Sequence, residues 1–101
     1  MSTDSFRDYV LEQLAALEGL RCRRMFGGHG LYCGERFFGV LHDGRLYFKT
    51  NPGNLPDFLS RDCAVFAPSK KQGLKNYREV PVEILEDAGS LARWARRAAQ
   101  E

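Results

Sequence analysis

The chain has 101 residues and a net charge of +2, with 44% hydrophobic and 28% charged residues. This length fits a single domain covering residues 1–101, whose core needs no disulfide or metal for stability. The small net charge argues against a protein whose whole surface binds nucleic acid. No apolar run approaches the roughly 18 residues that span a bilayer, and the N-terminal residues lack the pattern of a signal peptide.

The N-terminal residues are predicted to form an amphipathic helix that packs on the core. Their apolar side chains recur at helical spacing, at Phe6, Val10, Leu14 and Leu17. Ser2 or Thr3 is placed to cap this helix, and Gly19 is a plausible C-terminal stop.

Consecutive β-hairpins are predicted between Arg23 and Thr50. Gly34-Glu35 suits a two-residue turn with glycine at its first central position, and Asp43-Gly44 suits a turn in which both central residues have positive φ. Gly27-Gly28 makes either a third turn or a bulge. Strands joined in this way form an antiparallel meander of three or four strands.

These turns predict which side chains share a face of the sheet, because side chains alternate along a strand. The face expected beneath the helices carries Tyr32, Phe37, Leu41, Leu46 and Phe48, together with Gly30 and Gly39. The paired glycines would leave a shallow notch where a helix approaches closely. The second face carries Leu31, Phe38, Val40 and Tyr47, with basic residues around them.

An apolar centre with a basic rim is typical of an interface. The candidate interaction surface on the second face consists of Arg36, Phe38, Val40, Arg45, Tyr47 and Lys49. The alternative is that the remainder of the same chain covers this face.

After Thr50, the segment Asn51-Pro52-Gly53 breaks the strand. A short helix is predicted from residue 54 or 56 to residue 60, with Leu55, Phe58 and Leu59 buried. The apolar run from Cys63 to Phe66 predicts a short strand.

The last third of the chain is predicted to contain one more strand and two helices. The strand lies within residues 74–80, and Pro81 opens a short helix that ends near Asp87. Ser90 is expected to cap the final helix, whose apolar face consists of Leu91, Trp94, Ala95 and Ala98. The predicted fold class is therefore α+β.

The cysteines Cys22, Cys33 and Cys63 are odd in number and irregularly spaced, which predicts free thiols and a cytoplasmic location. With His29 and His42 they are possible zinc ligands, but no compact ligand pair of the CxxC or HxxxH type is present. We therefore predict no metal and no cofactor. If Gly27-Gly28 is a two-residue turn, Cys22 faces Cys33, and a metal or disulfide there is the alternative.

Basic residues form a second candidate site for contact with DNA. The candidate basic patch consists of Arg21, Arg23, Arg24, Lys70 and Lys71. Binding to phosphate requires several of these side chains to converge on one surface. The alternative is that each group is simply a solvated part of the surface.

Several separated motifs resemble the TfoX/Sxy family, N-terminal domain. They are Arg24 to Tyr32, Phe38-Gly39, Leu46 to Lys49, Tyr77 to Pro81 and Trp94-Ala95. The resemblance implies a two-layer fold similar to secretion chaperones, in which an antiparallel sheet has its helices on one side. Founding members regulate competence genes with the cyclic-AMP receptor protein and carry a second, C-terminal domain, so this chain is expected to be a stand-alone form.

We therefore expect a non-enzymatic regulatory or interaction module that binds a protein partner or forms a homodimer. DNA is the weaker expectation for a partner, and no membrane association is expected. The alternative is a small ligand-binding or enzymatic domain that uses His29 and Cys33 near the turn formed by residues 27–30.

Overall fold

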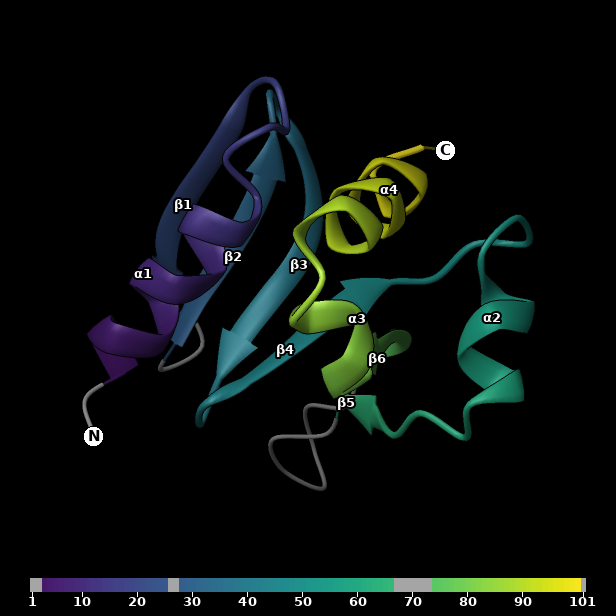
Figure 1. Ribbon diagram of the computed structural model, residues 1–101. Coiled ribbons are helices and arrows are strands. Elements are labelled where there is room, and N and C mark those ends of the chain that lie inside the picture. Colours follow the sequence, from purple (N-terminus) through teal and green to yellow (C-terminus); the bar gives the residue numbers. More distant parts are fainter. Residues whose placement is uncertain (1–2, 26–27, 67–73, 101) are drawn as a thin grey trace.

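A six-stranded antiparallel sheet and four helices form two layers in the described part of the chain (Figure 1). The computed structural model describes residues 3–25, 28–66 and 74–100. The strand order is β1-β2-β3-β4-β6-β5, with bounds β1 (Leu20–Met25), β2 (Gly28–Cys33), β3 (Arg36–His42), β4 (Arg45–Lys49), β5 (Val65–Phe66) and β6 (Leu74–Glu79). The helices are α1 (Thr3–Gln13), α2 (Leu55–Ser60), α3 (Val82–Leu85) and α4 (Ala88–Ala98). The predicted α+β class is confirmed, and the meander predicted with three or four strands has four, β1 to β4.

The main hydrophobic core fills the space between the helices and one face of the sheet (Figure 1). Each helix contributes to it, and the fully buried side chains include Val10 and Leu14 from the N-terminal segment and Leu91 from α4. Phe58 of α2 packs edge-on against Trp94 of α4, with ring centroids 4.8 Å apart. All four helices therefore cover the same face, which we call the helix-covered face; the opposite side is the helix-free face.

Two helix ends differ from the prediction. Helix α1 ends at Gln13, and turns carry the chain on to Gly19, which has a φ of +75°. Helix α4 begins at Ala88, so that Asp87 and not Ser90 is the N-terminal cap. The Ser90 hydroxyl lies in the first turn and donates a hydrogen bond of 2.7 Å to Asp87 Oδ2. Aspartate and serine both favour helix N-termini, and here Asp87, the earlier of the two in the sequence, occupies the cap position.

The region after β4 mostly follows the prediction. Asn54 precedes α2 and Pro81 precedes α3, as expected. Strand β5 is limited to Val65–Phe66, which is shorter than the predicted strand from residue 63 to residue 66. Leu59 is 53% exposed, so the expectation that it is buried was wrong.

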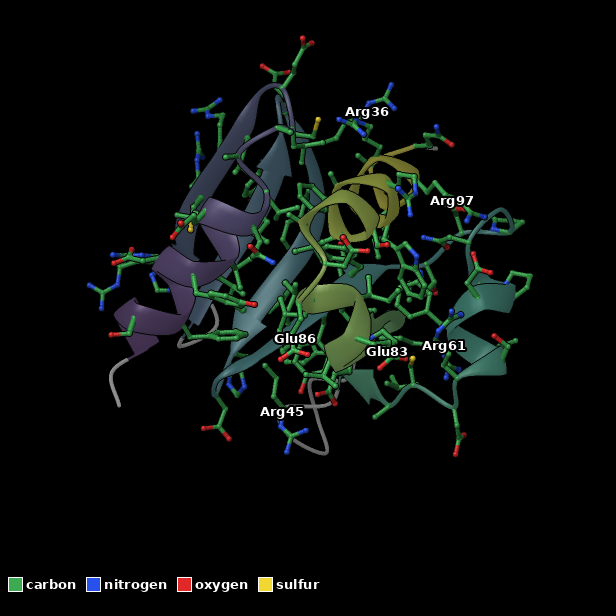
Figure 2. All side chains as sticks on the ribbon, in the orientation of Figure 1. Arg36, Arg45, Arg61, Glu83, Glu86 and Arg97 are labelled. Atoms are coloured by element: carbon green, nitrogen blue, oxygen red, sulfur yellow. The ribbon has the colours of Figure 1, made fainter. Side chains whose placement is uncertain are left out.

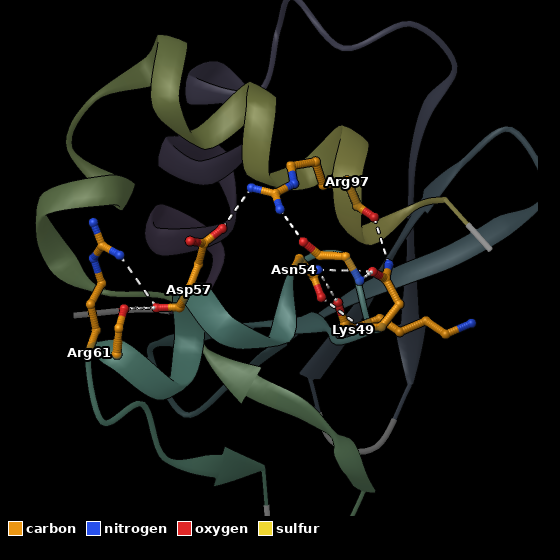
Figure 3. Close-up of polar contacts among 8 residues, drawn as sticks. Lys49, Asn54, Asp57, Arg61 and Arg97 are labelled. Atoms are coloured by element: carbon orange, nitrogen blue, oxygen red, sulfur yellow. Dashed lines mark hydrogen bonds and ion pairs between the residues drawn. The ribbon is translucent and has the colours of Figure 1, made fainter.

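A polar junction fixes the exit of β4 to the start of α2 and the end of α4 (Figure 3). Asn54, which is buried, donates from Nδ2 to the carbonyl of Lys49 at 3.0 Å and accepts from the backbone N–H of Asn51 at 2.7 Å. Asn51 Nδ2 in turn donates to the carbonyl of Arg97 at 2.8 Å. The Arg97 guanidinium pairs with Asp57 Oδ2 at 2.6 Å. Because buried polar groups need partners, this network satisfies the backbone where the sheet layer meets the helices.

Both predicted two-residue turns are confirmed. Gly34 has a φ of +65°, and Asp43 and Gly44 have φ values of +52° and +71°. The registers next to these turns also follow the prediction, since Cys33 pairs with Arg36 across the first turn. Residues 26–27 lie outside the described part, but β1 and β2 pair Met25 with Gly28. Cys22 is therefore opposite Leu31, so the alternative in which Cys22 faces Cys33 does not apply.

A β-bulge at Phe38 changes the face of every side chain before it in the meander. Strands β2 and β3 pair Tyr32 with Phe37 and then Leu31 with Gly39, which leaves Phe38 as an extra residue. Phe38 turns into the core against Phe48, with ring centroids 5.5 Å apart. Gly39 allows this close approach, because a Cβ there would lie 3.2 Å from Phe48 Cδ1.

The bulge corrects four predicted side-chain positions. Leu31 and Phe38 belong to the helix-covered face, whereas Tyr32 and Phe37 belong to the helix-free face. Gly30 pairs with Val40 on the helix-free side, so the predicted notch of paired glycines is absent there. Pairing between β3 and β4 follows the prediction throughout its four pairs, and Leu41, Leu46 and Phe48 lie in the core as expected.

The neighbours Phe37 and Phe38 provide a direct test of the bulge. We expect Phe38→Ala to lower the free energy of unfolding by about 3 to 5 kcal/mol, because the whole ring leaves a closed core. Phe37→Ala should cost only about 1 to 2 kcal/mol, because that ring is half-buried. Urea denaturation of both variants measures the difference, and a larger loss for Phe37→Ala would show an unbroken register.

Candidate functional site

The helix-free face carries aromatic side chains from five strands, β2 to β6. They belong to two groups that meet at the centre of the sheet. The first group consists of Tyr32, Phe37 and Tyr77. The second consists of Tyr47, Phe66 and His42, together with the aliphatic residue Val40.

Ring contacts join the members of each group. Tyr32 and Phe37 have centroids 5.2 Å apart, and Phe37 and Tyr77 are 5.3 Å apart. In the second group, Phe66 lies 4.6 Å from Tyr47 and 5.5 Å from His42. Such tilted and edge-on pairs stabilise a cluster beyond the burial of its area.

This face is covered in part by the chain itself. Phe66 comes from the edge strand β5, yet its ring reaches Tyr47 on β4 and is itself buried. Val40 is fully buried in the same cluster. Tyr47 and Phe37, by contrast, keep part of their surface in solvent. The chain itself therefore covers the centre of this face, as one of the two alternatives expected, while the surroundings stay accessible.

The predicted interaction surface is divided by the structure. Val40, Arg45, Tyr47 and Lys49 lie on the helix-free face as expected, although Val40 is covered. Phe38 and Arg36 do not lie on the helix-free face. Arg36 lies beside the C-terminal end of α4, where it donates to the carbonyl of Ala99 at 3.1 Å, far from Arg45 at the opposite end of the sheet (Figure 2).

The rim of the helix-free face carries both charges. Arg45 forms two hydrogen bonds with the carboxylate of Glu79, each at 3.1 Å. Lys49 stands opposite Tyr77 in the register of β4 and β6. The rim is therefore mixed rather than simply basic.

The predicted basic patch is also divided. Arg21 and Arg23 pair in register with Tyr32 and Gly30 on the helix-free side of the edge strand β1. Arg24 pairs with His29 and points to the other side, so it does not converge with them. Lys70 and Lys71 lie outside the described residues.

A surface hollow lies beside the two converging arginines. Its volume is about 230 Å³, and it is lined by Arg21, Arg23, Tyr32, Gly34 and Glu35. The Arg23 guanidinium carbon lies 5.6 Å from the centroid of the Tyr32 ring, within the range of a cation–π contact. Sequence reasoning did not find this site, because it placed Tyr32 on the opposite face.

The alternative site at His29 and Cys33 does not form one centre. They are four positions apart on β2, which places them about 13 Å apart along the strand. His29 is buried, and neither ring nitrogen has a hydrogen-bond partner among the described residues. Cys33 instead donates to the carbonyl of Glu18 at 3.2 Å. No shared nucleophile and base therefore arises from this pair.

The thiols do not have the features of activated nucleophiles. Burial raises the pKa of Cys22, and it also raises the pKa of Cys63. A raised pKa keeps a thiol protonated at neutral pH, whereas reactive cysteines need the thiolate. All three cysteines are free, and within residues 3–25, 28–66 and 74–100 no group of three acidic, histidine or cysteine side chains is placed to hold a metal.

The aromatic face makes alkaline stability depend on Tyr77. Burial, with a further contribution from Tyr32, raises the pKa of Tyr77 to about 12. The unfolded chain releases this proton near pH 10, so folding stability should fall as the pH rises from about 10 to about 12. We expect a late phase in the ultraviolet titration of tyrosinate that Tyr77→Phe removes and Tyr9→Phe retains. The same late phase in the Tyr77→Phe protein would contradict the assignment.

His29 offers a test of whether a buried polar side chain is kept for stability. Because both ring nitrogens lack partners within the part of the chain that the structure describes, replacement by an apolar residue of similar size removes an uncompensated desolvation cost. We expect His29→Leu to leave the free energy of unfolding unchanged or to raise it by about 1 kcal/mol. Thermal and urea denaturation measure this, and a marked loss of stability would show that the imidazole has a partner in solution.

Comparison with known families gives one match. The family model of the TfoX N-terminal domain matches residues 12–101. That range contains the whole sheet and α2, α3 and α4. No curated protein is similar enough to count as a relative. Among the described residues, no helix has the length and apolar character needed to cross a membrane.

Proposed function

Because this chain belongs to the TfoX N-terminal domain family, we propose that it is a regulatory module, without catalytic activity, that acts by binding another protein. The family is generally regulatory. A role in transcription regulation and a cytoplasmic location are part of the proposal. The free thiols support that location, because cysteines stay reduced in the cytosol.

The observation that carries the proposal is the partly accessible aromatic cluster on the helix-free face. Tyr47 rests on buried Phe66, so its ring is held in place before any partner arrives. Interfaces are rich in aromatic and arginine side chains, and a rigid aromatic anchor loses little conformational entropy on binding. Tyr47 with Arg45 beside it fits that description better than a solvated surface does.

A second copy of the chain is the partner that the rim favours. Twofold symmetry brings the same patch of both copies together. A patch of one charge would repel itself in that arrangement, whereas this rim contains Arg45 and Lys49 as well as Glu79. The mixed rim therefore supports a homodimer built on the helix-free face.

Substitutions that change the charge at this rim test whether the dimer forms through the helix-free face. We expect the wild-type protein to sediment as a dimer, and Tyr47→Asp to shift the equilibrium to monomer by at least about tenfold in the dissociation constant, which is 1.4 kcal/mol. Arg45→Glu should also weaken the dimer, and the double variant Arg45→Glu with Glu79→Arg should restore it.

Tyr9→Asp is the matched control, because Tyr9 is 39% exposed on α1 in the helical layer. This variant should keep the wild-type dissociation constant. Circular dichroism confirms that each variant is folded. A folded Tyr47→Asp protein that dimerises as the wild type does would contradict the proposed surface, as would a wild-type protein that stays monomeric and binds no protein through this face.

A further inference from the structure

The arginine end of the helix-free face has chemistry of its own. Arg21 and Arg23 lie two residues apart on β1, so both extend from the same side of the sheet edge. Both are exposed, and neither has an ion-pair partner within the described part of the chain. They line the hollow of about 230 Å³ together with Tyr32. Two unpaired guanidinium groups at one hollow attract an anion with oxygen acceptors.

The Tyr32 side chain adds an aromatic surface beside these two arginines. Tyr32 is the register partner of Arg21, and Arg23 lies over its ring. Phe37 supports Tyr32 from the next strand, and Tyr77 supports Phe37 in turn. Tyr77 is only 7% exposed, whereas Tyr32 and Phe37 are partly exposed. The partly exposed rings of Tyr32 and Phe37 are therefore supported by neighbouring rings and lie next to the two arginines.

We propose that Arg21, Arg23 and Tyr32 form a binding site for single-stranded nucleic acid. The guanidinium groups contact consecutive phosphates, and a base stacks on the accessible part of Tyr32, with Phe37 continuing the platform towards the centre of the sheet. Single-stranded nucleic acid is bound in this way elsewhere, by a positive edge beside aromatic rings. The site is distinct from the Tyr47 contact and does not depend on dimer formation.

Three observations favour a single strand over other anionic partners. Duplex DNA presents no free base face to an aromatic side chain, and a net charge of +2 is small for a protein that binds by phosphate contacts alone. An acidic peptide would leave the Tyr32–Phe37 platform without a planar partner. Glu35, which also lines the hollow, can accept hydrogen bonds from the amino groups of bases, which an acidic side chain does not offer.

Fluorescence anisotropy with a labelled single strand of about ten nucleotides tests the site. We expect the single strand to bind more tightly than a duplex of the same sequence. The double variant Arg21→Ala with Arg23→Ala should reduce the slope of log affinity against log salt by about 1.4, which corresponds to two phosphate contacts on a single strand. Tyr32→Leu, which keeps apolar volume but removes the stacking ring, should weaken binding by about tenfold or more.

Arg24→Ala is the matched control, because it removes an exposed arginine from the same strand but from the opposite face. It should change the affinity by less than about twofold in moderate salt, where distant exposed charges are screened. Equal losses for Arg24→Ala and the double variant would overturn the proposal, because they would show a charge effect without a site. Failure of the single strand to bind at low salt, or equal affinity for the duplex, would overturn it as well.

The two proposals are separated by one cross-test. Tyr47→Asp should keep the wild-type affinity for the oligonucleotide, and the Arg21→Ala, Arg23→Ala variant should keep the wild-type dissociation constant of the dimer. A loss of oligonucleotide binding in monomeric, folded Tyr47→Asp would overturn the independence of the site. Equal affinity for a mononucleotide and for the oligonucleotide would overturn the proposal that Phe37 extends the stacking surface beyond Tyr32.

Discussion

The single extra residue at Phe38 determines how the layers of this protein are assembled. Without it, an unbroken alternation along β3 would place Phe38 outside and Phe37 inside. With it, Phe38 and Gly39 both face the helices, and the pairing of β2 shifts by one residue. Because the side-chain period of a strand is two, a shift of one residue moves every side chain of β2 to the other face. The core therefore gains Leu31 and Phe38, whereas Tyr32 and Phe37 go to the helix-free face.

This exchange gives each face a different physical character. The helix-covered face is closed by aliphatic and phenylalanine side chains, and the polar junction around Asn54 holds α2 and α4 against it. The helix-free face instead carries tyrosines and a mixed set of charges, with Phe66 supplying local cover. Stability thus depends mainly on one side of the sheet. The other side is free to bind, since its accessible side chains are not required to close the core.

The helix-free face carries the two proposed binding sites at its two ends. Near β4 and β6, a supported tyrosine within a rim of both charges fits a second copy of the chain. Near β1, Arg21 and Arg23, which have no ion-pair partner among the described residues, lie beside Tyr32 at the proposed site for a phosphate with a stacked base. In both sites a partly exposed tyrosine packs against a neighbouring aromatic ring, so little conformational freedom is lost on binding. Two separate sites on one face would suit a regulatory domain that binds more than one partner.

The amino-acid sequence by itself determined the local features of this protein: the α+β class, the turns at Gly34-Glu35 and Asp43-Gly44, and the register of β3 with β4. These follow from nearest-neighbour chemistry, because glycine and aspartate favour positive φ and a two-residue turn sets the pairing next to it. Only the tertiary structure decided which aromatic residues reach the surface and which arginines converge. Phe37 and Phe38 are chemically identical neighbours, and no local preference distinguishes the one that packs inside. That choice depends on how well Phe38 and Gly39 fit against Phe48 and Leu31, which lie on the two neighbouring strands and meet them only when the sheet is assembled.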